Sequence, residues 1–578
     1  THCSRYIASD RFAKLFHKKK GKQARFGLTS SMMNRQSLSS FHKTFEALFQ
    51  RTLNIDEILT FVRTADQKNI DSLVLSAPID SKSGSTFLHE AIDAGSSQLT
   101  EWLLEHGAPV NRSGGATKDT PLIRAARSAD PEIMRMVLDH ADFYDIFMDD
   151  SGKWTCLHHA ARFGSADCVR LIVEFALKHA QSKNDSIKVS QFFDAQTSGG
   201  WTALHHATRH EHFDAIKVLV EEAHCNLDIV HQDKWTPCLQ ACSYGFTDIA
   251  IYYIEKGAKL TFFGKNGWSN LSHAAHKGYT EIAKVLLEHD ILLLTQNKEG
   301  WTPIHHCCRY GHLEIAKLII ESAIKRNILK KVVTSKTNNL WLPIHYATRY
   351  GGYDIVKLLI DNGSPVNAQH KDGWTPLIQC SAYNLPKIAG LLLLHNAKLN
   401  VHTKGLWRPI HHATRNNHLD VLRQLLMAPG IDTDVQHKDG WSPLHQATHY
   451  GHIHAARLLI EAGCNLELQS KGMFTPLHFA FYYKKPEIAK LLLAAGAKMS
   501  LPSTYKDLRS FVVTHSPNLI QIHDAPVRKA LTLRLMCIRV VREKKIHLPK
   551  SYPHLLLQPR PLNELAEFLE LNETTETD

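Results

Sequence analysis

The sequence predicts an all-α solenoid of about twelve stacked repeats, each a helix-turn-helix with a short β-hairpin finger, followed by a small helical C-terminal module. Three observations support this prediction. A phrase close to Trp-Thr-Pro-Leu-His-x-Ala recurs along the chain. Nine of the eleven intervals between its copies lie within two residues of 33, a period typical of repeat solenoids. Hydrophobic residues make up 43% of the 578 residues and charged residues 21%, a composition that can form a buried core.

The residue in the Thr place of the phrase marks the start of the first helix of each repeat. The markers are Thr86, Thr120, Thr155, Thr202, Thr236, Ser269, Thr302, Leu342, Thr375, Arg408, Ser442 and Thr475. Two intervals are longer, 47 and 40 residues, and place insertions at about 176–194 and 322–337. We expect these insertions to be loops. Loops on a rigid scaffold can carry recognition, but tolerated length variation is the favoured interpretation.

Each repeat contains the local signals of a helix pair. Thr375 and Pro376 fit an N-cap followed by proline in the first helical position. Apolar residues from Ile355 to Ile360 recur at helical spacing and predict a second helix. Gly363 follows that helix and suits a left-handed helix end. Such a short pair cannot bury its apolar face alone, so neighbouring repeats must stack.

These phrases resemble ankyrin repeats over residues 84–503. The clearest matches are Thr375-Pro376-Leu377, Trp441-Ser442-Pro443-Leu444-His445 and Phe474-Thr475-Pro476-Leu477-His478. The resemblance implies an L-shaped stack with projecting fingers and a concave groove lined by the first helices. It also implies a protein-binding molecule without catalytic activity.

Histidine is abundant, with 38 residues, and much of it follows the repeat. The resemblance implies that the His of the phrase forms hydrogen bonds across repeats, at His89, His158, His205, His305, His345, His411, His445 and His478. The alternative is a metal site at doublets such as His158-His159 and His411-His412. Adjacent helical residues face different directions and make a poor chelate, so structural histidine is favoured. We expect no metal and no cofactor.

Nine of the ten tryptophans occupy one repeat position, directly before the marker. They are Trp154, Trp201, Trp235, Trp268, Trp301, Trp341, Trp374, Trp407 and Trp441, and Phe474 continues the series. One interpretation is a partner-binding row, because tryptophan is enriched at interface hot spots. The other is that each indole packs against the next finger and stiffens the stack. The two interpretations are compatible.

A second row lies beyond the His of the phrase, where the first helix should face the groove. Its cationic members include Arg127, Arg162, Arg209, Arg309, Arg349 and Arg415, and its aromatic members include Phe163, Tyr244, Tyr310, Tyr350 and Tyr450. Guanidinium and aromatic groups together suit an acidic or phosphorylated peptide. Single-stranded nucleic acid would also fit, although the ankyrin resemblance favours protein. The alternative is that arginine is simply common at this position.

The two ends differ from the repeats. Residues 1–40 are basic and Ser-rich, with Lys18-Lys19-Lys20, and predict a flexible tail more than a nuclear signal or membrane patch. Residues 41–83 contain a helical pattern and are expected to cap the stack. Residues 504–578 should form the helical C-terminal region. There Leu533, Cys537 and Val541 are spaced i, i+4 and i+8, as on one apolar helix stripe.

Residues 532–569 resemble a SOCS box. Thr532-Leu533, Cys537 and Val541 match the elongin-binding half of that motif, and Leu565 with Phe568-Leu569 matches part of the cullin-selecting half. Pro559-Arg560-Pro561-Leu562 replaces the usual Leu-Pro-Leu-Pro. The resemblance implies elongin B/C bound at Leu533, Cys537 and Val541, and a cullin approached by Pro561, Leu565, Phe568 and Leu569. The alternative is an amphipathic helix that caps the last repeat.

Together these features predict a non-catalytic substrate receptor of a cullin-RING ubiquitin ligase, with the target in the ankyrin groove. The alternative is a scaffold that links signalling, cytoskeletal or membrane partners. The net charge of +12 permits acidic partners. No Ser-His-Asp order or phosphate loop supports an enzyme with a small-molecule substrate, and no apolar run is long enough for a transmembrane helix. The scattered, odd number of 11 cysteines favours a reducing compartment, the cytoplasm or the nucleus.

Overall fold

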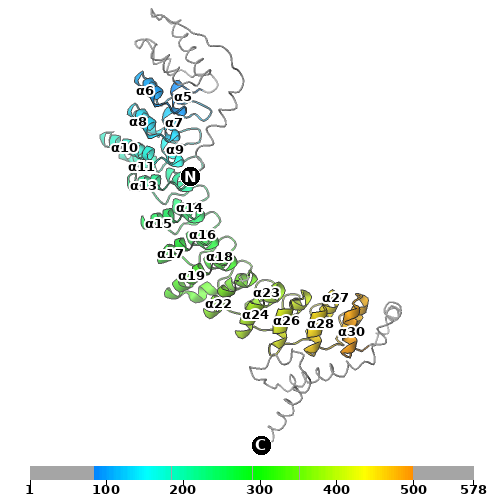
Figure 1. Cartoon of the computed structure of the whole chain (residues 1–578). Coiled ribbons are helices and arrows are strands. Elements are labelled where there is room, and N and C mark those ends of the chain that lie inside the picture. Colours follow the sequence, from blue (N-terminus) through cyan, green and yellow to red (C-terminus); the bar gives the residue numbers. More distant parts are fainter. Residues whose placement is uncertain (1–83, 184, 290, 351, 499–578) are drawn as a thin grey trace, which may run out of the picture. The chain divides into compact units, whose positions relative to one another are not determined.

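A computed structural model describes residues 84–183, 185–289, 291–350 and 352–498 (Figure 1). The predictions for residues 1–40, 41–83 and 504–578, including the 532–569 segment, lie outside the described residues. Within them the chain is an all-α solenoid of 26 α-helices and one 3-10 helix, without a strand. It divides into two units: unit 1 contains residues 84–198 and 214–225, and unit 2 contains residues 199–213 and 226–498.

Unit 1 contains three helix pairs, a 3-10 helix and two further helices. Its elements are α5 (Phe87–Asp93), α6 (Ser97–Glu105), α7 (Pro121–Ser128), α8 (Pro131–Asp139), η1 (Asp145–Phe147), α9 (Cys156–Phe163), α10 (Ala166–Lys183), α11 (Ser186–Phe193) and α13 (Phe213–Glu221). First helices pack on first helices, α5 on α7 and α7 on α9, while α6 packs on α8. Each repeat therefore buries its apolar face against its neighbours, as stacking requires.

Unit 2 repeats the same arrangement over more copies. Its first helices are α12 (Ala203–Arg209), α14 (Pro237–Tyr244), α16 (Asn270–Lys277), α18 (Pro303–Tyr310), α21 (Pro343–Arg349), α23 (Pro376–Tyr383), α25 (Pro409–Arg415), α27 (Pro443–Tyr450) and α29 (Pro476–Tyr482). Its second helices are α15 (Thr247–Glu255), α17 (Thr280–Glu288), α19 (Leu313–Lys325), α22 (Tyr353–Asp361), α24 (Pro386–Leu394), α26 (Leu419–Met427), α28 (Ile453–Glu461) and α30 (Pro486–Ala494). A short helix, α20 (Leu329–Val333), follows α19. Successive first helices lie side by side (Figure 1).

The predicted helix signals are confirmed. The Thr375 hydroxyl accepts a hydrogen bond from the backbone N–H of Ile378 at 3.3 Å, and Pro376 occupies the first turn of α23. Gly363, just beyond α22, has a φ of +82°, which glycine adopts without the steric penalty of a side chain. Along α22 the residues Ile355, Val356 and Leu359 are buried, as the helical spacing requires.

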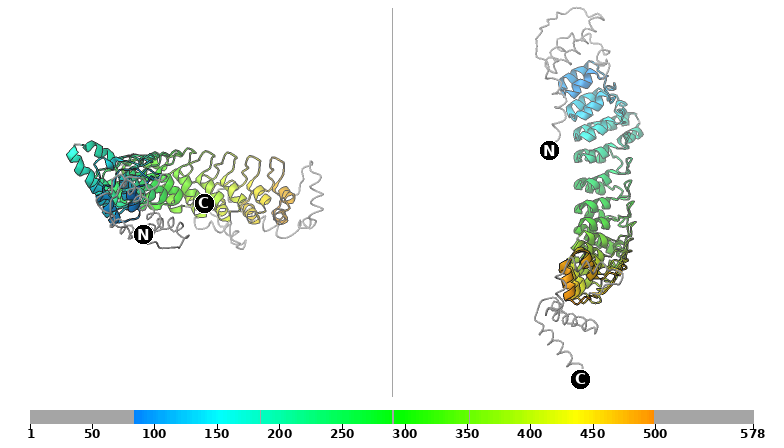
Figure 2. Two further views of the ribbon diagram at one scale, coloured as in Figure 1. Left: turned by 90° about the horizontal axis from the view of Figure 1, so that it is seen from above. Right: turned by 90° about the vertical axis from the view of Figure 1, so that its right-hand side faces the viewer.

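The fingers are tight turns closed by backbone hydrogen bonds. In one finger the N–H of His370 donates to the carbonyl of Trp374 at 3.2 Å, and the N–H of Lys371 donates to Asn339 of the preceding finger at 3.1 Å. Figure 2 shows the loops of unit 2 rising in a row on one side of the helices. Only isolated bridges occur in the described residues, at Gly114–Asp119 and Asp149–Thr155, because each finger is too short for a ladder.

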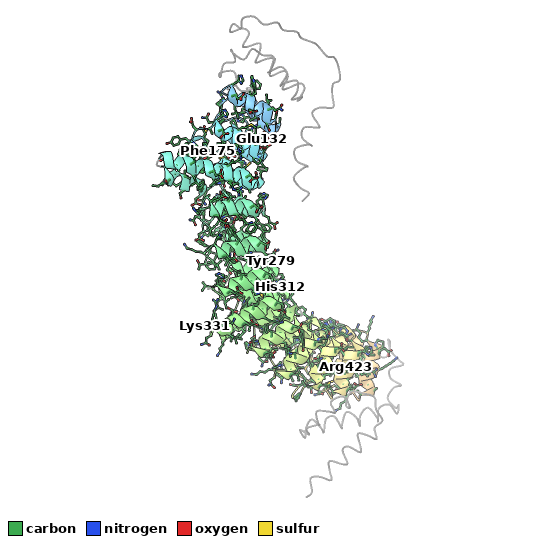
Figure 3. All side chains as sticks on the ribbon, turned by 60° about the vertical axis from the view of Figure 1, so that its left-hand side comes forward. Glu132, Phe175, Tyr279, His312, Lys331 and Arg423 are labelled. Atoms are coloured by element: carbon green, nitrogen blue, oxygen red, sulfur yellow. The ribbon has the colours of Figure 1, made fainter. Side chains whose placement is uncertain are left out.

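Second helices of unit 2 begin beside a side chain that reaches back to the preceding repeat. Tyr279 precedes α17, and its hydroxyl donates to the carbonyl of Tyr244 at 3.2 Å. His312 precedes α19, and its Nε2 lies 3.2 Å from the carbonyl of His276 (Figure 3). These bonds satisfy carbonyls near the ends of the first helices α14 and α16, which have no partner within their own helix.

The two insertions are helical, so the expectation of loops was wrong. In unit 1 the insertion lengthens α10 and adds α11, where Val189, Phe192 and Phe193 are 2%, 4% and 3% exposed. In unit 2 it lengthens α19 and adds α20, where Val332 and Val333 are also buried. The physical reason is that each inserted helix carries apolar residues, and burying them against the rest of the stack lowers the free energy of the folded chain.

Candidate functional site

The histidine of the repeated phrase uses both ring nitrogens. The backbone N–H of Thr302 donates to His305 Nδ1 at 3.1 Å, and the Thr302 hydroxyl lies 2.8 Å from the same atom. Nε2 must then carry the ring proton, and it donates to the carbonyl of Trp341 in the next repeat at 3.2 Å. The predicted cross-repeat hydrogen bond is therefore confirmed. Equivalent Nε2 contacts are made by His89, His158, His205, His345, His411 and His445.

The second histidine of each doublet points elsewhere, into the layer of tryptophans. His306 lies 4.5 Å from Trp268 and 5.1 Å from Trp301 between ring centroids, whereas His305 faces the helix cap. Burial lowers the pKa of His305 to about 4 and that of His306 to about 3, so both rings are neutral at pH 7. No group of three or more His, Cys, Asp or Glu residues in the described part of the chain could hold a metal ion.

In unit 2 the tryptophans of the fingers form a continuous column of rings. A histidine, tyrosine or phenylalanine lies between each pair of neighbouring indoles. Around its middle, Tyr346 lies 4.3 Å from Trp301 and 4.8 Å from Trp341, and His370 stacks on Trp341 at 4.6 Å and 14°. In the order of their ring contacts, the members of the column are Trp201, His231, Trp235, His273, Trp268, His306, Trp301, Tyr346, Trp341, His370, Trp374, His412, Trp407, His437, Trp441, Phe479 and Phe474.

The column confirms the interpretation in which each indole packs against its neighbours. The tryptophans are half-buried, so a row of fully exposed indoles is not present. Each of these indoles contacts a neighbouring aromatic side chain, and such a contact contributes about 0.5–1.5 kcal/mol beyond the buried area. In unit 1 the corresponding Trp154 lies 5.1 Å from His159.

Five of the six predicted arginines lie over the indoles of their own repeats. The guanidinium carbon is 5.2 Å from the ring centroid for Arg162 over Trp154 in unit 1. In unit 2 the corresponding pairs are Arg209 over Trp201 at 5.3 Å, Arg309 over Trp301 at 5.6 Å, Arg349 over Trp341 at 5.4 Å and Arg415 over Trp407 at 5.1 Å. The two rows deduced from the sequence are thus one surface, and we call the four pairs of unit 2 the Arg–Trp row.

The arginines of the Arg–Trp row keep their charge available. Among the described residues, no carboxylate lies within 4.0 Å of Arg209, Arg309, Arg349 or Arg415. Arg127 of unit 1 differs, since it forms an ion pair with Asp119 at 2.8 Å. The aromatic members of the predicted row are about half exposed: Phe163 47%, Tyr244 43%, Tyr310 46%, Tyr350 47% and Tyr450 40%.

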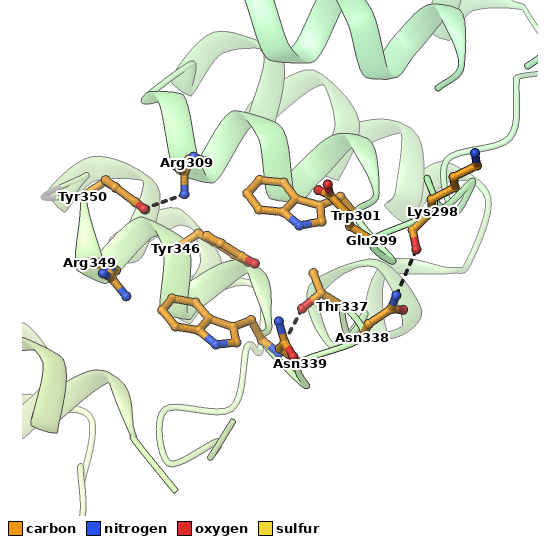
Figure 4. Close-up of a pocket in the computed structure, with 11 residues that line it drawn as sticks. Lys298, Glu299, Trp301, Arg309, Thr337, Asn338, Asn339, Tyr346, Arg349 and Tyr350 are labelled. Atoms are coloured by element: carbon orange, nitrogen blue, oxygen red, sulfur yellow. Dashed lines mark hydrogen bonds between the residues drawn. The ribbon is translucent and has the colours of Figure 1, made fainter. Parts of the chain in front are cut away.

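A pocket of about 430 Å³ opens on the Arg–Trp row between two neighbouring repeats. Figure 4 shows its residues, which come from two fingers and from α18 and α21. They are Lys298, Glu299, Trp301, Arg309, Thr337, Asn338, Asn339, Trp341, Tyr346, Arg349 and Tyr350. Arg309 donates a hydrogen bond to the Tyr350 hydroxyl. The side-chain amide of Asn338 donates to the carbonyl of Lys298 at 2.9 Å and ties the two fingers together.

The structure thus brings five predicted residues to one place, the two tryptophans, the two arginines and Tyr350. Tyr310 lies on α18 but does not line the pocket, and the other predicted members of the rows lie on other repeats. Leu533, Cys537, Val541, Pro561, Leu565, Phe568 and Leu569 lie outside the described residues. Sequence reasoning missed Tyr346 and five finger residues of the pocket, which are Lys298, Glu299, Thr337, Asn338 and Asn339. Tyr346 had a signal, because it replaces the second histidine of the doublets.

None of the described helices has both the length and the apolar character that a bilayer crossing requires.

Comparison with known sequences gives one family. A sequence profile described as ankyrin repeats (3 copies) matches nine overlapping segments that together run from residue 62 to residue 502, about three quarters of the chain. No curated protein gives a significant match. Ankyrin repeats are protein–protein interaction modules, and members of the family typically bind rather than catalyse. With its cross-repeat histidines, finger turns and stacked helix pairs, the chain belongs to the ankyrin-repeat family.

Proposed function

We propose that this protein is an adaptor that holds an acidic segment of a partner protein along the Arg–Trp row. One observation carries the proposal: four guanidinium groups rest on indoles while no carboxylate of the described residues pairs with them. A guanidinium held on an aromatic ring has already lost side-chain freedom, so less entropy remains to be lost on binding. Carboxylate and phosphate groups are its natural ligands.

Charge reversal along the row tests the proposal. We expect Arg209→Glu with Arg415→Glu to abolish binding of the purified full chain to an array of short acidic peptides. The matched control is Lys284→Glu with Lys357→Glu, on exposed positions of the second helices α17 and α22, which changes the net charge equally. If both double variants lose the same binding affinity, the loss is explained by the change in net charge, and the proposal is contradicted. Unchanged binding by the row variant would contradict it as well.

We further propose the specific role of substrate receptor in a cullin-RING ubiquitin ligase. The support is the sequence pattern Thr532-Leu533, Cys537 and Val541, followed by Leu565 and Phe568-Leu569. Elongin B/C and a cullin would bind there, while the Arg–Trp row holds the target. Ubiquitin transfer would occur on other subunits, so this chain contributes proximity and orientation.

A pull-down with recombinant elongin B/C tests this role. We expect the full chain to bind stoichiometrically, and Leu533→Asp and Cys537→Asp to abolish binding. Leu535→Asp is the matched control, because residue 535 lies off the i, i+4, i+8 stripe. Failure of the folded wild-type chain to bind would leave the alternative, an ankyrin scaffold that links signalling, cytoskeletal or membrane partners.

We also propose that the chain acts in the cytoplasm or nucleus. Nine cysteines of the described residues are buried free thiols, and this usage suits a reducing compartment. Imaging of a fluorescent fusion of the full chain tests the compartment, and accumulation in the secretory pathway would contradict it.

A further inference from the structure

The seventh residue after the marker is an arginine in several repeats. At the pocket between α18 and α21, two successive repeats of unit 2 both have arginine at this position. Along that position unit 2 has Arg209, Ser243, His276, Arg309, Arg349, Ala382, Arg415, His449 and Tyr482. Arg309 and Arg349 both line the pocket, whereas Arg209 and Arg415 each lack an arginine in the adjacent repeat of unit 2. The pocket therefore concentrates charge that is spread singly elsewhere on the row.

The charge of the pocket lining is net positive. Lys298, Arg309 and Arg349 contribute three cations, and Glu299 contributes one anion. No ion pair within 4.0 Å joins Glu299 to these cations in the described residues. The lining thus carries a net charge of +2, and a carboxylate with a single negative charge would neutralise only half of it.

Aromatic rings hold the two guanidinium groups in place. Arg309 lies 4.6 Å from the ring centroid of Tyr350 and 5.6 Å from that of Trp301. Arg349 lies 5.3 Å from Tyr383 and 5.4 Å from Trp341. The hydroxyl oxygen of Tyr350 accepts a hydrogen bond from Arg309, so its own proton remains available to donate to a ligand. Figure 4 shows Arg309, Arg349 and Tyr350 at one side of the pocket, with Trp301 and Tyr346 beside them.

We infer that this pocket binds a phosphorylated side chain of the partner, an inference that rests on the proposed function of the Arg–Trp row. A phosphate monoester carries about −1.5 to −2 charges at pH 7, which matches the charge of the lining. Its three oxygens can accept hydrogen bonds from both arginines and from the Tyr350 hydroxyl. The indole and phenol rings form the walls against which the body of the side chain packs. A volume of about 430 Å³ accommodates either a phosphoserine or a phosphotyrosine.

A peptide array followed by affinity measurement tests the inference on the full chain. Each peptide is made in four versions that differ only at the central residue: phosphotyrosine, phosphoserine, tyrosine and glutamate. We expect the best phosphopeptide to bind at least tenfold more tightly than its glutamate version. The two phosphorylated versions distinguish which side chain the pocket prefers.

Pocket variants locate the binding. Arg309→Gln and Arg349→Gln should each weaken phosphopeptide binding at least tenfold. Lys284→Gln and Lys357→Gln are matched controls, since each removes one positive charge from an exposed position of α17 or α22, outside both the Arg–Trp row and the pocket, and should change binding less than threefold. Thermal unfolding of each variant verifies the fold. Arg349 is exposed, so its variant remains informative if Arg309→Gln does not fold.

Three outcomes would overturn the inference: equal affinity for phosphorylated and glutamate peptides, equal losses in pocket and control variants, or no peptide bound. The proposed function stands apart from this test. If charge reversal at Arg209 and Arg415 abolishes acidic-peptide binding while the pocket variants have no effect, the row binds partners and the phosphate pocket is wrong. If neither set of variants changes binding, both proposals fail.

Discussion

A single histidine joins three parts of this fold. His305 accepts hydrogen bonds from the start of its own helix and donates one to the carbonyl of Trp341, the tryptophan whose ring continues the column. Local order within one repeat, the junction to the next repeat and the position of an indole of the Arg–Trp row thus depend on one imidazole. This linkage explains why the polar imidazole is fully buried at the centre of this repeat.

We expect His305→Ala to lower the free energy of unfolding by about 2–4 kcal/mol, because the Thr302 N–H loses its acceptor and a cavity remains. Chemical denaturation of the full chain measures the change. His395→Ala is the control, since His395 is exposed and should change stability by less than about 0.5 kcal/mol. Similar effects of the two substitutions would show that the cross-repeat bond does not stabilise the fold.

Two glycines at equivalent positions separate backbone strain from steric conflict. Gly278 and Gly311 have φ of +85° and +81°. A Cβ at Gly278 would collide with the ring of His312, whereas a Cβ at Gly311 would have no heavy atom within 4 Å apart from those of the adjoining residues. We expect Gly311→Ala to destabilise the protein by about 1 kcal/mol and Gly278→Ala by about 2–4 kcal/mol, measured by urea unfolding. Equal losses would mean that the His312 ring moves aside at no cost.

At the scale of elements, the inserted helices show how a repeat protein absorbs extra length. α11 and α20 contribute apolar residues to the neighbouring repeat instead of extending into solvent. In α11 the ring of Phe192 meets Phe147 edge to face at 5.4 Å. The insertion in unit 1 is thus part of the core of that unit.

We expect Phe192→Ala to destabilise unit 1 by about 3–5 kcal/mol, because it removes a buried aromatic side chain. Hydrogen exchange of residues 186–193 reports the local loss. Ile187→Ala on the same helix is the control, since Ile187 is 76% exposed and its loss should leave exchange unchanged. Protection that survives in Phe192→Ala would show that α11 is held by other contacts.

The sequence predicted correctly those helix ends that are determined by residues close by in the chain. Thr375 caps α23 and Gly363 ends the turn after α22, because each signal acts within a few residues of its own position. The helices of the insertions were missed because the burial of Phe192 and Val333 depends on a neighbouring repeat. The same reason applies to the pocket: Arg309 and Trp301 follow the repeat, but Asn338 becomes part of the site only when two fingers are brought together.

At the scale of the molecule, many buried histidines share one direction of pKa shift. Burial lowers the pKa of His345 and His445 to about 4, and that of His411 to about 3. Their pKa in the unfolded chain is about 6.5. Between these values the unfolded chain binds more protons than the folded chain, so stability must fall as pH falls.

We therefore expect the melting temperature to be constant between about pH 7 and pH 8 and to fall steadily from pH 6.5 towards pH 4. The loss between pH 6.5 and pH 5 isolates histidine, because carboxylates with ordinary pKa values titrate mostly below that range. Thermal unfolding across this series measures it. A melting temperature that is flat between pH 7 and pH 5 would show that the buried imidazoles take up protons without unfolding.

The hydrogen bond from His305 to Trp341 also has an evolutionary meaning. The unit that can be gained or lost by recombination runs from one marker to the next, because the contacts between successive first helices recur from repeat to repeat. Excision of residues 342–374 would place Thr375 directly after Trp341, so His305 would keep its acceptor and the following helix would begin with a hydroxyl cap where Leu342 provides none. The same event would delete Arg349, Tyr346 and Tyr350 together. Descendants of such a gene would thus lose a specificity while keeping a fold, and lineages could change partners by altering repeat number alone.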